Sequence, residues 1–121
     1  MSKIIKLSTF SDNRGSLTVI EKEIPFNFKR IYYIYGVDNS ERGKHRHKKT
    51  IQAAICLSGE CEIYCNNGTK KTTYKLDSPN KCLILDPKDW HKMYNFSKDA
   101  ILMVIASEPF DKSDYIFEEY K

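Results

Sequence analysis

The fold is decided by residues 51–68, which read IQAAICLSGECEIYCNNG. Two β-rich runs, 51–57 and 61–65, are separated by the turn signal Ser58-Gly59, and the second run ends at Asn66-Asn67-Gly68. An Asn-Gly pair after an apolar run is a strong signal of a two-residue β-hairpin turn. This stretch therefore predicts antiparallel strands joined by short turns.

The same pattern continues in both directions along the chain. Further short runs rich in β-branched and aromatic residues cover 16–20, 30–35, 72–76, 82–85 and 100–106. Strands at intervals of roughly ten residues are typical of an antiparallel sandwich or barrel. Helix signals are confined to the tail, where Asp111 or Ser113 is expected to cap a turn that runs toward Glu119. The predicted fold class is therefore all-β, with little helix.

The size and hydropathy of the chain predict a single cytoplasmic domain. A length of 121 residues is that of one ordinary domain, so residues 1–121 are expected to fold together. No apolar run approaches the ~18 residues that a membrane span needs. The opening residues also lack the long apolar segment and cleavage site of a signal peptide. We therefore expect no membrane partner.

The charge pattern favours a small anionic ligand over nucleic acid. The net charge of +4 comes from 20 basic and 16 acidic residues, and only four of the basic residues are arginines. A nucleic-acid binder usually concentrates arginine and lysine in a stripe with aromatic platforms. The densest basic stretch here, residues 44–49, is interrupted by two histidines. A mild basic excess suits an anionic small molecule equally well.

The cysteines show no pattern of a metal site or of a disulfide scaffold. The four cysteines are Cys56, Cys61, Cys65 and Cys82, and none forms a CxxC pair. Cys61 and Cys65 lie on one face of an alternating stretch beside Ile63, which indicates apolar packing. We expect reduced thiols without a chemical role.

The three histidines fall into two compact clusters. The first is Gly43-Lys44-His45-Arg46-His47, followed by Gln52, and the second is Pro87-Lys88-Asp89-Trp90-His91, followed by Asn95. On an extended strand residues i and i+2 point to the same side, so His45 and His47 are expected to share a face. For an isolated HxH pair, the alternative is two solvated histidines in a charged loop.

Together the two clusters resemble the paired motifs of the cupin superfamily, whose metal-binding members use two histidines, a glutamate and a later histidine as ligands. The first cluster matches at Gly43, His45 and His47, and the second at Pro87, His91 and Asn95. Gln52 stands where the ligand glutamate is expected. A neutral amide is a weaker ligand that brings no charge to offset a divalent cation. We therefore expect no metal and imidazoles that titrate near neutrality, although three histidines alone remain compatible with zinc.

Within the cupins, the chain resembles the dTDP-sugar 3,4-ketoisomerases over nearly its whole length. The matching stretches are Arg14-Gly15-Ser16-Leu17, Ile24-Pro25-Phe26, 29–34, 42–49, Ser78-Pro79-Asn80, 90–93, Ala106-Ser107 and Ser113-Asp114-Tyr115-Ile116. Arg46 stands where a small residue is expected, and its side chain is expected to point away from the cavity and to do little. The resemblance implies a small cupin barrel, that is, a double-stranded β-helix or jelly roll. It also implies conversion of dTDP-4-keto-6-deoxyglucose into a dTDP-3-keto-6-deoxyhexose for deoxyamino sugar biosynthesis, without a cofactor.

For that reaction four residues are candidate catalytic groups. His45 is expected to remove the C3 proton, and His47 to relay protons or to donate to the sugar oxygens, although the roles of the two histidines are interchangeable. Arg30 and Tyr32 share a face of the 30–35 strand, which we expect to point into the cavity. Tyr32 is then placed to shuttle a proton between O3 and O4, the alternative being a packing tyrosine. His91 supplies a third titratable group.

Four further residues are candidate substrate ligands. Arg14, Arg30 and Arg42 are candidates for the two phosphates, because guanidinium groups bind phosphate oxygens bidentately. Arg42 has the alternative role of ordering the loop before Gly43. Gln52 is expected to hydrogen-bond a sugar hydroxyl. His91 with Arg14 beside it favours the product inverted at C4, the galacto isomer.

The sequence is also compatible with two other functions, and the resemblance implies a homodimer. The alternative functions are a cupin 3,5-epimerase, a class of longer chains with a His–Asp couple, and a non-catalytic cupin that only binds a sugar nucleotide. Small cupins often form homodimers in which an exchanged N-terminal strand protects a sheet edge. Residues 1–10 are the candidate for such a strand.

Overall fold

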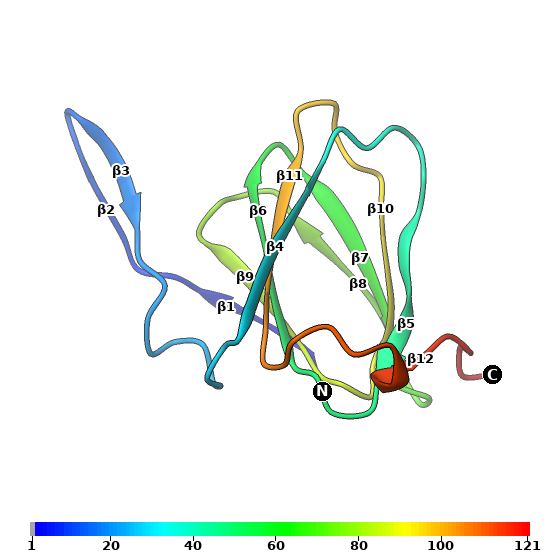
Figure 1. The fold of residues 1–121 in the computed structure, drawn as a ribbon. Helices are drawn as coiled ribbons and strands as arrows, with labels where there is room; N and C mark the ends of the chain where they lie inside the picture. Colours follow the sequence, from blue (N-terminus) through cyan, green and yellow to red (C-terminus); the bar gives the residue numbers. More distant parts are fainter. Residues whose placement is uncertain (1) are drawn as a thin grey trace.

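Two five-stranded antiparallel sheets face each other in the computed structural model, which describes residues 2–121 (Figure 1). The first sheet has the order β1 (Lys3–Lys6), β9 (Lys81–Leu85), β6 (Gln52–Ser58), β11 (Ile101–Ala106) and β4 (Arg30–Tyr35). The second has the order β12 (Tyr115–Ile116), β5 (Arg42–His47), β10 (Trp90–Tyr94), β7 (Cys61–Asn66) and β8 (Lys71–Leu76). A separate hairpin consists of β2 (Thr9–Asp12) and β3 (Gly15–Thr18), and a 3-10 turn, η1, covers Lys112–Asp114. This is the all-β cupin-type barrel that the sequence predicts.

The main core fills the space between the two sheets. It contains apolar side chains of β6, β7, β9, β10 and β11, among them Ile63, Leu83 and Val104, all fully buried. Cys61 and Cys65 belong to this core and every cysteine is a buried free thiol, so the predicted packing role is confirmed. Alternation along β7 thus decides which side chains face the interior.

A second apolar cluster covers the outer face of the first sheet. Leu7 and Ile24 pack there against Ile55, Ile84 and Ile105. Strand β6 is therefore buried on both faces along residues 52–56. This explains why the stretch AAIC, residues 53–56, is continuously apolar instead of alternating.

The seven predicted strand runs are all strands, with ends within two residues of the predicted ones. The hairpin after β7 is also present, but its loop has four residues, 67–70, instead of two. The side-chain oxygen of Asn67 accepts hydrogen bonds from the backbone N–H groups of Thr69 and Lys70 and so stabilises the longer loop. Strand β1 lies in the segment 1–10 that was expected to contain a strand, whereas the sequence missed β2, β10 and β12, which contain too few consecutive apolar residues to stand out.

The tail differs from the predicted turn toward Glu119. Asp111 does cap a short turn, since its carboxylate accepts from the backbone N–H of Ser113. The turn ends at Asp114, and the next two residues form β12, in which Tyr115 pairs with His47 of β5. Pairing with the sheet edge therefore replaces the expected helical continuation. Within residues 2–121 no helix has the length and hydropathy to cross a bilayer.

The N-terminal segment has two parts. Strand β1 pairs with β9 of the same chain, and Ser2 donates from its backbone N–H and its hydroxyl to buried Asp89. From Thr9 onward the β2–β3 hairpin projects from the barrel (Figure 1). Met1 lies outside the described residues. Exchange of residues 1–10 between subunits stays a prediction, and the hairpin is the part that extends furthest from its own barrel.

Candidate active site

All three imidazoles gather at one end of the second sheet. His45 and His47 lie on β5 and His91 lies on the neighbouring strand β10, in register with His45. The ring centroids of His45 and His47 are 4.9 Å apart, as are those of His45 and His91, and those of His47 and His91 are 6.2 Å apart. The predicted common face of His45 and His47 is therefore observed.

A β-bulge at the start of β5 brings these rings together. His45 pairs with His91, but Lys92 pairs with Gly43, so Lys44 is the extra residue, with a φ of 63°. Gly43 has a φ of 83°, and a Cβ there would lie 3.3 Å from the backbone oxygen of His91. A glycine is therefore needed for β5 to approach β10 this closely.

The Nδ1 atom of each ring faces a carbonyl or carboxylate oxygen, which can accept a hydrogen bond but cannot donate one. His45 Nδ1 lies 3.0 Å from the Gly43 carbonyl, His47 Nδ1 lies 2.9 Å from an Asp114 carboxylate oxygen, and His91 Nδ1 lies 3.3 Å from the Asp89 carbonyl. Each Nδ1 therefore carries the hydrogen, and each Nε2 keeps its lone pair. The Nε2 atoms of His47 and His91 are buried and have no hydrogen-bond partner among the described residues. Such unpaired buried nitrogens are available to a bound molecule.

Burial keeps these imidazoles neutral at physiological pH. It lowers the pKa of His91 to about 3 and that of His45 to about 4, in each case with a smaller contribution from a neighbouring histidine. Burial also lowers the pKa of His47, although the hydrogen bond to Asp114 opposes this. The prediction of imidazoles titrating near neutrality is therefore wrong for the free protein, because it did not include the cost of burying a charged ring.

A cavity of about 220 Å³ opens beside the imidazoles. It is lined by Arg30, Tyr32 and Ile34 of β4, Arg42, Gly43 and His45 of β5, Met93 of β10 and Tyr115 of β12. Arg30 and Tyr32 thus face the interior as predicted, while the alternate residues Ile31, Tyr33 and Tyr35 are exposed.

Gln52 and Tyr32 form a hydrogen-bonded pair beside the cavity. The Gln52 amide N–H donates to the Tyr32 hydroxyl at 3.1 Å, and the Gln52 carbonyl oxygen is buried without a partner among the described residues. Burial raises the pKa of Tyr32, which keeps its hydroxyl protonated. Residues 2–121 contain no group of three or more His, Cys, Asp or Glu side chains arranged to hold a metal ion.

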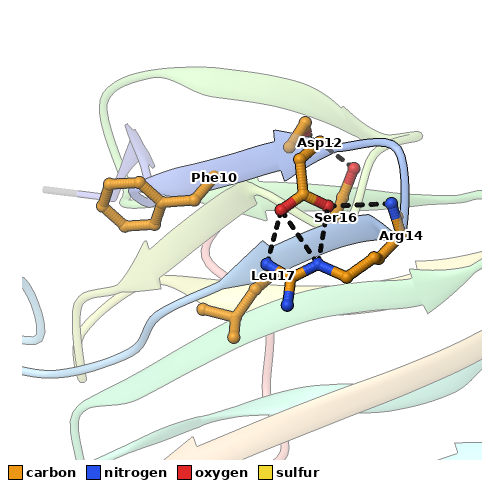
Figure 2. A pocket seen from close by; sticks show the side chains of 7 residues that line it. Phe10, Asp12, Arg14, Ser16 and Leu17 are labelled. Carbon is orange, nitrogen blue, oxygen red and sulfur yellow. Dashed lines mark hydrogen bonds and ion pairs between the residues drawn. The ribbon is translucent and has the colours of Figure 1, made fainter.

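The three candidate phosphate ligands lie in different surroundings. Arg30 lies 4.4 Å from the centroid of the Tyr32 ring, and Arg42 is exposed where β5 borders the cavity. Arg14, in contrast, lies at the turn of the projecting hairpin, and its side chain is 86% exposed. Its guanidinium Nη2 lies 2.6 Å from Asp12 Oδ2 (Figure 2). The expectation that Arg14 lies beside His91 is wrong within one chain, because the hairpin points away from β10 (Figure 1).

The hairpin also carries a larger hollow of about 490 Å³, which is bordered by Phe10, Asp12, Arg14 and Leu17 among others (Figure 2). Residues of the hairpin alone line it, and no imidazole borders it. We therefore assign the candidate active site to the smaller cavity at the histidines.

Two residues of the sequence motifs differ from expectation, Asn95 in its position and Arg46 in its role. Asn95 lies in an exposed turn with a φ of 52° and donates to Glu62, so it takes no part in the cavity. Arg46 points away from the cavity, as predicted, but the expectation that its side chain does little is wrong. Its guanidinium donates to the Tyr120 hydroxyl at 2.7 Å and holds the C-terminal tail.

Sequence reasoning missed two site residues in that tail. Asp114 is 3% exposed and accepts hydrogen bonds from His47 and Thr50 and from the backbone of Lys48 and Lys49. The Tyr115 ring lies 4.6 Å from that of His45 and 4.7 Å from that of His47. Their motif, residues 113–116, was recognised, but a predicted helical turn concealed the pairing of β12 with β5.

Comparisons with known proteins identify the family. The family described as "FdtA: WxcM-like, C-terminal" matches residues 1–121. The chain is 43% identical over 118 residues to a TDP-4-oxo-6-deoxy-alpha-D-glucose-3,4-oxoisomerase of Aneurinibacillus thermoaerophilus, with 95% of this chain and 85% of that protein covered. The chain belongs to the TDP-sugar 3,4-ketoisomerases.

Two solved ketoisomerase structures from Campylobacter jejuni superpose closely on this ketoisomerase. WlaRB, a TDP-quinovose 3,4-ketoisomerase, is 42% identical with a TM-score of 0.92, and the match covers 97% of this chain and 92% of that one. WlaRA, a TDP-fucose-3,4-ketoisomerase, is 38% identical with a TM-score of 0.90, and the match covers 97% of this chain and 89% of that one. The predicted isomerase class is confirmed.

The ketoisomerase shares only its fold with a dTDP-4-dehydrorhamnose 3,5-epimerase of Bacillus anthracis. That structure is 16% identical with a TM-score of 0.82, over 94% of this chain and 76% of the epimerase. The HxH pair and the short chain argue against an epimerase, but a His–Asp couple does not mark that class alone, because this ketoisomerase has the buried pair His47 and Asp114. What separates this chain from the epimerase is their low sequence identity of 16%, and not the presence of a His–Asp couple.

Proposed function

We propose that this ketoisomerase converts dTDP-4-keto-6-deoxyglucose into a dTDP-3-keto-6-deoxyhexose by metal-free acid–base catalysis. The ketone at C4 acidifies the hydrogen on C3, so a base can remove that proton while O4 gains one. The resulting enediol then loses the proton on O3 and gains one at C4. Hydrogen thus moves from C3 to C4 and no electrons leave the sugar, so no cofactor is required.

The observation that carries this proposal is the cluster of three neutral imidazoles, of which His45 lines the cavity and His47 and His91 lie buried beside it. A neutral imidazole is the form that accepts a proton, and two of the Nε2 atoms have no partner among the described residues. We assign proton removal at C3 to His45 and proton relay to His47, roles that are interchangeable, with His91 as a third group. Tyr32 accepts from Gln52, which leaves its own hydrogen free to move between O3 and O4.

Substrate binding in this proposal uses arginines and the buried amide. Arg30 and Arg42 border the cavity and supply guanidinium groups for the phosphates. The unpaired carbonyl oxygen of Gln52 is available to a sugar hydroxyl. The dTDP-linked sugar named for the Aneurinibacillus relative fits these groups.

The proposal includes a homodimer that brings Arg14 to the site of a second chain. The hairpin exposes Phe10 by 65% and Leu17 by 60%, and it extends away from its own barrel (Figure 1). Strand β4 is a sheet edge with an exposed apolar outer face, which soluble proteins usually cover. Packing the hairpin of one chain on the barrel of another covers both surfaces and accounts for the distance of Arg14 from His91.

For the stereochemistry at C4 we propose the galacto product. The two Campylobacter relatives are named for different sugars at similar identity, so family membership alone does not decide the product. We assign protonation at C4 to His91 of the neighbouring strand β10, whose buried Nε2 atom has no partner among the described residues. Such a product suits a pathway that makes amino sugars in the cytoplasm, in which an aminotransferase uses the C3 ketone.

The proposal is tested by proton NMR of purified protein with dTDP-4-keto-6-deoxyglucose in deuterated water. We expect loss of the H3 signal and deuterium at C4 in deuterated water, and the small H4–H5 coupling of the galacto isomer in product made in ordinary water. Exchange at C5 would instead indicate a 3,5-epimerase. His45→Asn should abolish turnover yet keep binding of dTDP, measured by calorimetry, with exposed Tyr33→Phe as the control. A protein that binds the sugar nucleotide without any exchange at C3 would be a non-catalytic cupin.

A further inference from the structure

The strongest unassigned feature is the carboxylate of Asp114, buried behind His47. The His47 side chain is 3% exposed and that of Asp114 is 2% exposed. His47 Nδ1 lies 2.9 Å from Asp114 Oδ2. Oδ2 also accepts from the Thr50 hydroxyl, and Oδ1 accepts from the backbone N–H groups of Lys48 at 3.1 Å and Lys49 at 2.8 Å. All four partners are donors, so the carboxylate is fully satisfied as an acceptor.

This arrangement allows one protonation pattern for the neutral His47 ring. Burial raises the pKa of Asp114, but the hydrogen bonds from Thr50, Lys49 and His47 outweigh it and lower the pKa to about 2. An ionised carboxylate has no hydrogen to donate, so His47 must carry its hydrogen on Nδ1. The lone pair is then on Nε2, which is buried and has no partner among the described residues.

The other two imidazoles lack such a carboxylate. His45 and His91 donate from Nδ1 to the backbone carbonyls of Gly43 and Asp89. A carbonyl orients a ring, but it carries no full charge to offset an imidazolium. An ionised carboxylate does both: it carries the offsetting charge, and a hydrogen bond to an ionised acceptor is roughly twice as strong as one between neutral groups.

We infer that Asp114 is a positioning residue that holds His47 as the Nδ1–H tautomer, so that its Nε2 atom is the one that accepts the relayed proton. The inference rests on the proposed function for the identity of the sugar, but the tautomer itself can be measured without any substrate. It also gives the tail a role in the reaction, because Asp114 is brought to His47 by the pairing of β12 with β5.

The decisive variant is Asp114→Asn, which keeps the shape of the side chain. Its amide oxygen still accepts from the backbone of Lys48 and Lys49, so the loop after β5 keeps its anchor. The amide nitrogen in place of Oδ2 donates toward His47 Nδ1, which favours a lone pair on Nδ1 and a hydrogen on Nε2. We expect the tautomer to reverse and kcat to fall roughly 100-fold or more, with KM changed by less than about threefold.

The matched control is Asp111→Asn, the same substitution at the cap of η1. Asp111 accepts from the backbone and the hydroxyl of Ser113 and does not contact His47, and asparagine caps such turns equally well. We expect this variant to keep the wild-type tautomer and kcat. An equal loss of kcat in both variants would reduce Asp114 to a structural residue of the turn.

The tautomer is read by long-range ¹H–¹⁵N correlation spectra of protein labelled with ¹⁵N-histidine, which contains only three imidazoles. The expected result is Nδ1–H for His47 in the wild type and Nε2–H in Asp114→Asn. A wild-type His47 with its hydrogen on Nε2, or an unchanged tautomer in the variant, overturns the inference. If the tautomer reverses but the wild type does not turn over the keto sugar, the positioning role stands and the proposed function fails.

Discussion

The guanidinium of Arg46 lies 4.0 Å from the centre of the Tyr120 ring and donates to the hydroxyl of the same residue at 2.7 Å. Arg46 stands between the two histidines of β5, so the strand that carries His45 and His47 on its inner face holds the C-terminal tail on its outer face. The Trp90 indole N–H donates to the Phe117 carbonyl and fastens the same tail to β10.

Arg46→Ala is therefore expected to loosen the tail and destabilise the protein. Loss of a cation–π contact and a hydrogen bond costs about 1–2 kcal/mol, a fall of roughly 5 °C in Tm. Thermal unfolding followed by circular dichroism measures this. Tyr120→Phe keeps the ring but loses the hydroxyl, which accepts from Arg46 and donates to the Lys88 carbonyl, so its Tm should fall as well. An unchanged Tm in Arg46→Ala would mean that the tail is held without this contact.

Gly43→Ala is expected to damage both stability and catalysis. The new Cβ combines a strained positive φ with a contact of 3.3 Å to the His91 backbone oxygen. Gly36→Ala is the control, because its φ of 70° gives similar strain while its Cβ meets nothing within 4 Å. Each substitution should cost about 1 kcal/mol from strain, but only Gly43→Ala should also lower kcat. Equal kcat values in the two variants would show that spacing between β5 and β10 is unimportant.

Tyr32→Phe separates the two interpretations of this tyrosine. If its hydroxyl moves a proton between O3 and O4, kcat should fall roughly 100-fold. Stability should fall by about 1–3 kcal/mol, because the buried Gln52 amide loses its partner. The neighbouring Tyr33→Phe, 63% exposed on the same strand, should leave both quantities unchanged. A kcat for Tyr32→Phe within threefold of wild type would leave Tyr32 as a packing residue.

Stability is expected to fall as the pH is lowered below about 6.5. The pKa values of His45 and His91 are lowered from 6.5 to about 4 and about 3 in the folded protein. Between these values the unfolded chain binds more protons than the folded one, so stability rises with pH through this window and is fully present above it. A series of Tm values from pH 7 to pH 4.5 measures the slope, and His91→Asn should make it shallower. A flat series would mean that the rings are not buried as described.

Arg14 is expected to act in the site of the second chain. Arg14→Ala and His45→Asn should each be nearly inactive as homodimers. A heterodimer of the two, purified with different affinity tags, should regain activity, because one of its sites combines an intact His45 with the partner's Arg14. If the heterodimer is no more active than its parents, then Arg14 does not act across the interface.

The regular part of the fold follows from local patterns. Strand β4 begins and ends where the run 30–35 predicts, and its alternation correctly assigns Arg30 and Tyr32 to the inner face. Strand β10 was missed because Trp90-His91-Lys92-Met93-Tyr94 mixes polar and apolar residues on a strand that lies between β5 and β7. Its strand character comes from the two neighbours that pair with it, which local patterns do not reveal.

The candidate site was predicted only where its residues are close in sequence. The shared face of His45 and His47 follows from a period of two, whereas Asp114 lies 67 residues from His47 and reaches it through the pairing of β12. The position of Arg14 was mispredicted because matching motifs say nothing about whether a hairpin folds back on its own barrel. The low pKa values of the imidazoles depend on burial, a property of the assembled sheets.

The attachment of Asp114 to His47 has a consequence for the newly made chain. His47 leaves the ribosome 67 residues before the carboxylate that orients its ring. Both large sheets, apart from β12, can therefore form while the imidazole is still unanchored. Nascent chains at this stage are expected to present a barrel that does not yet process sugar nucleotides, and competence for the reaction arrives with the segment that carries Asp114.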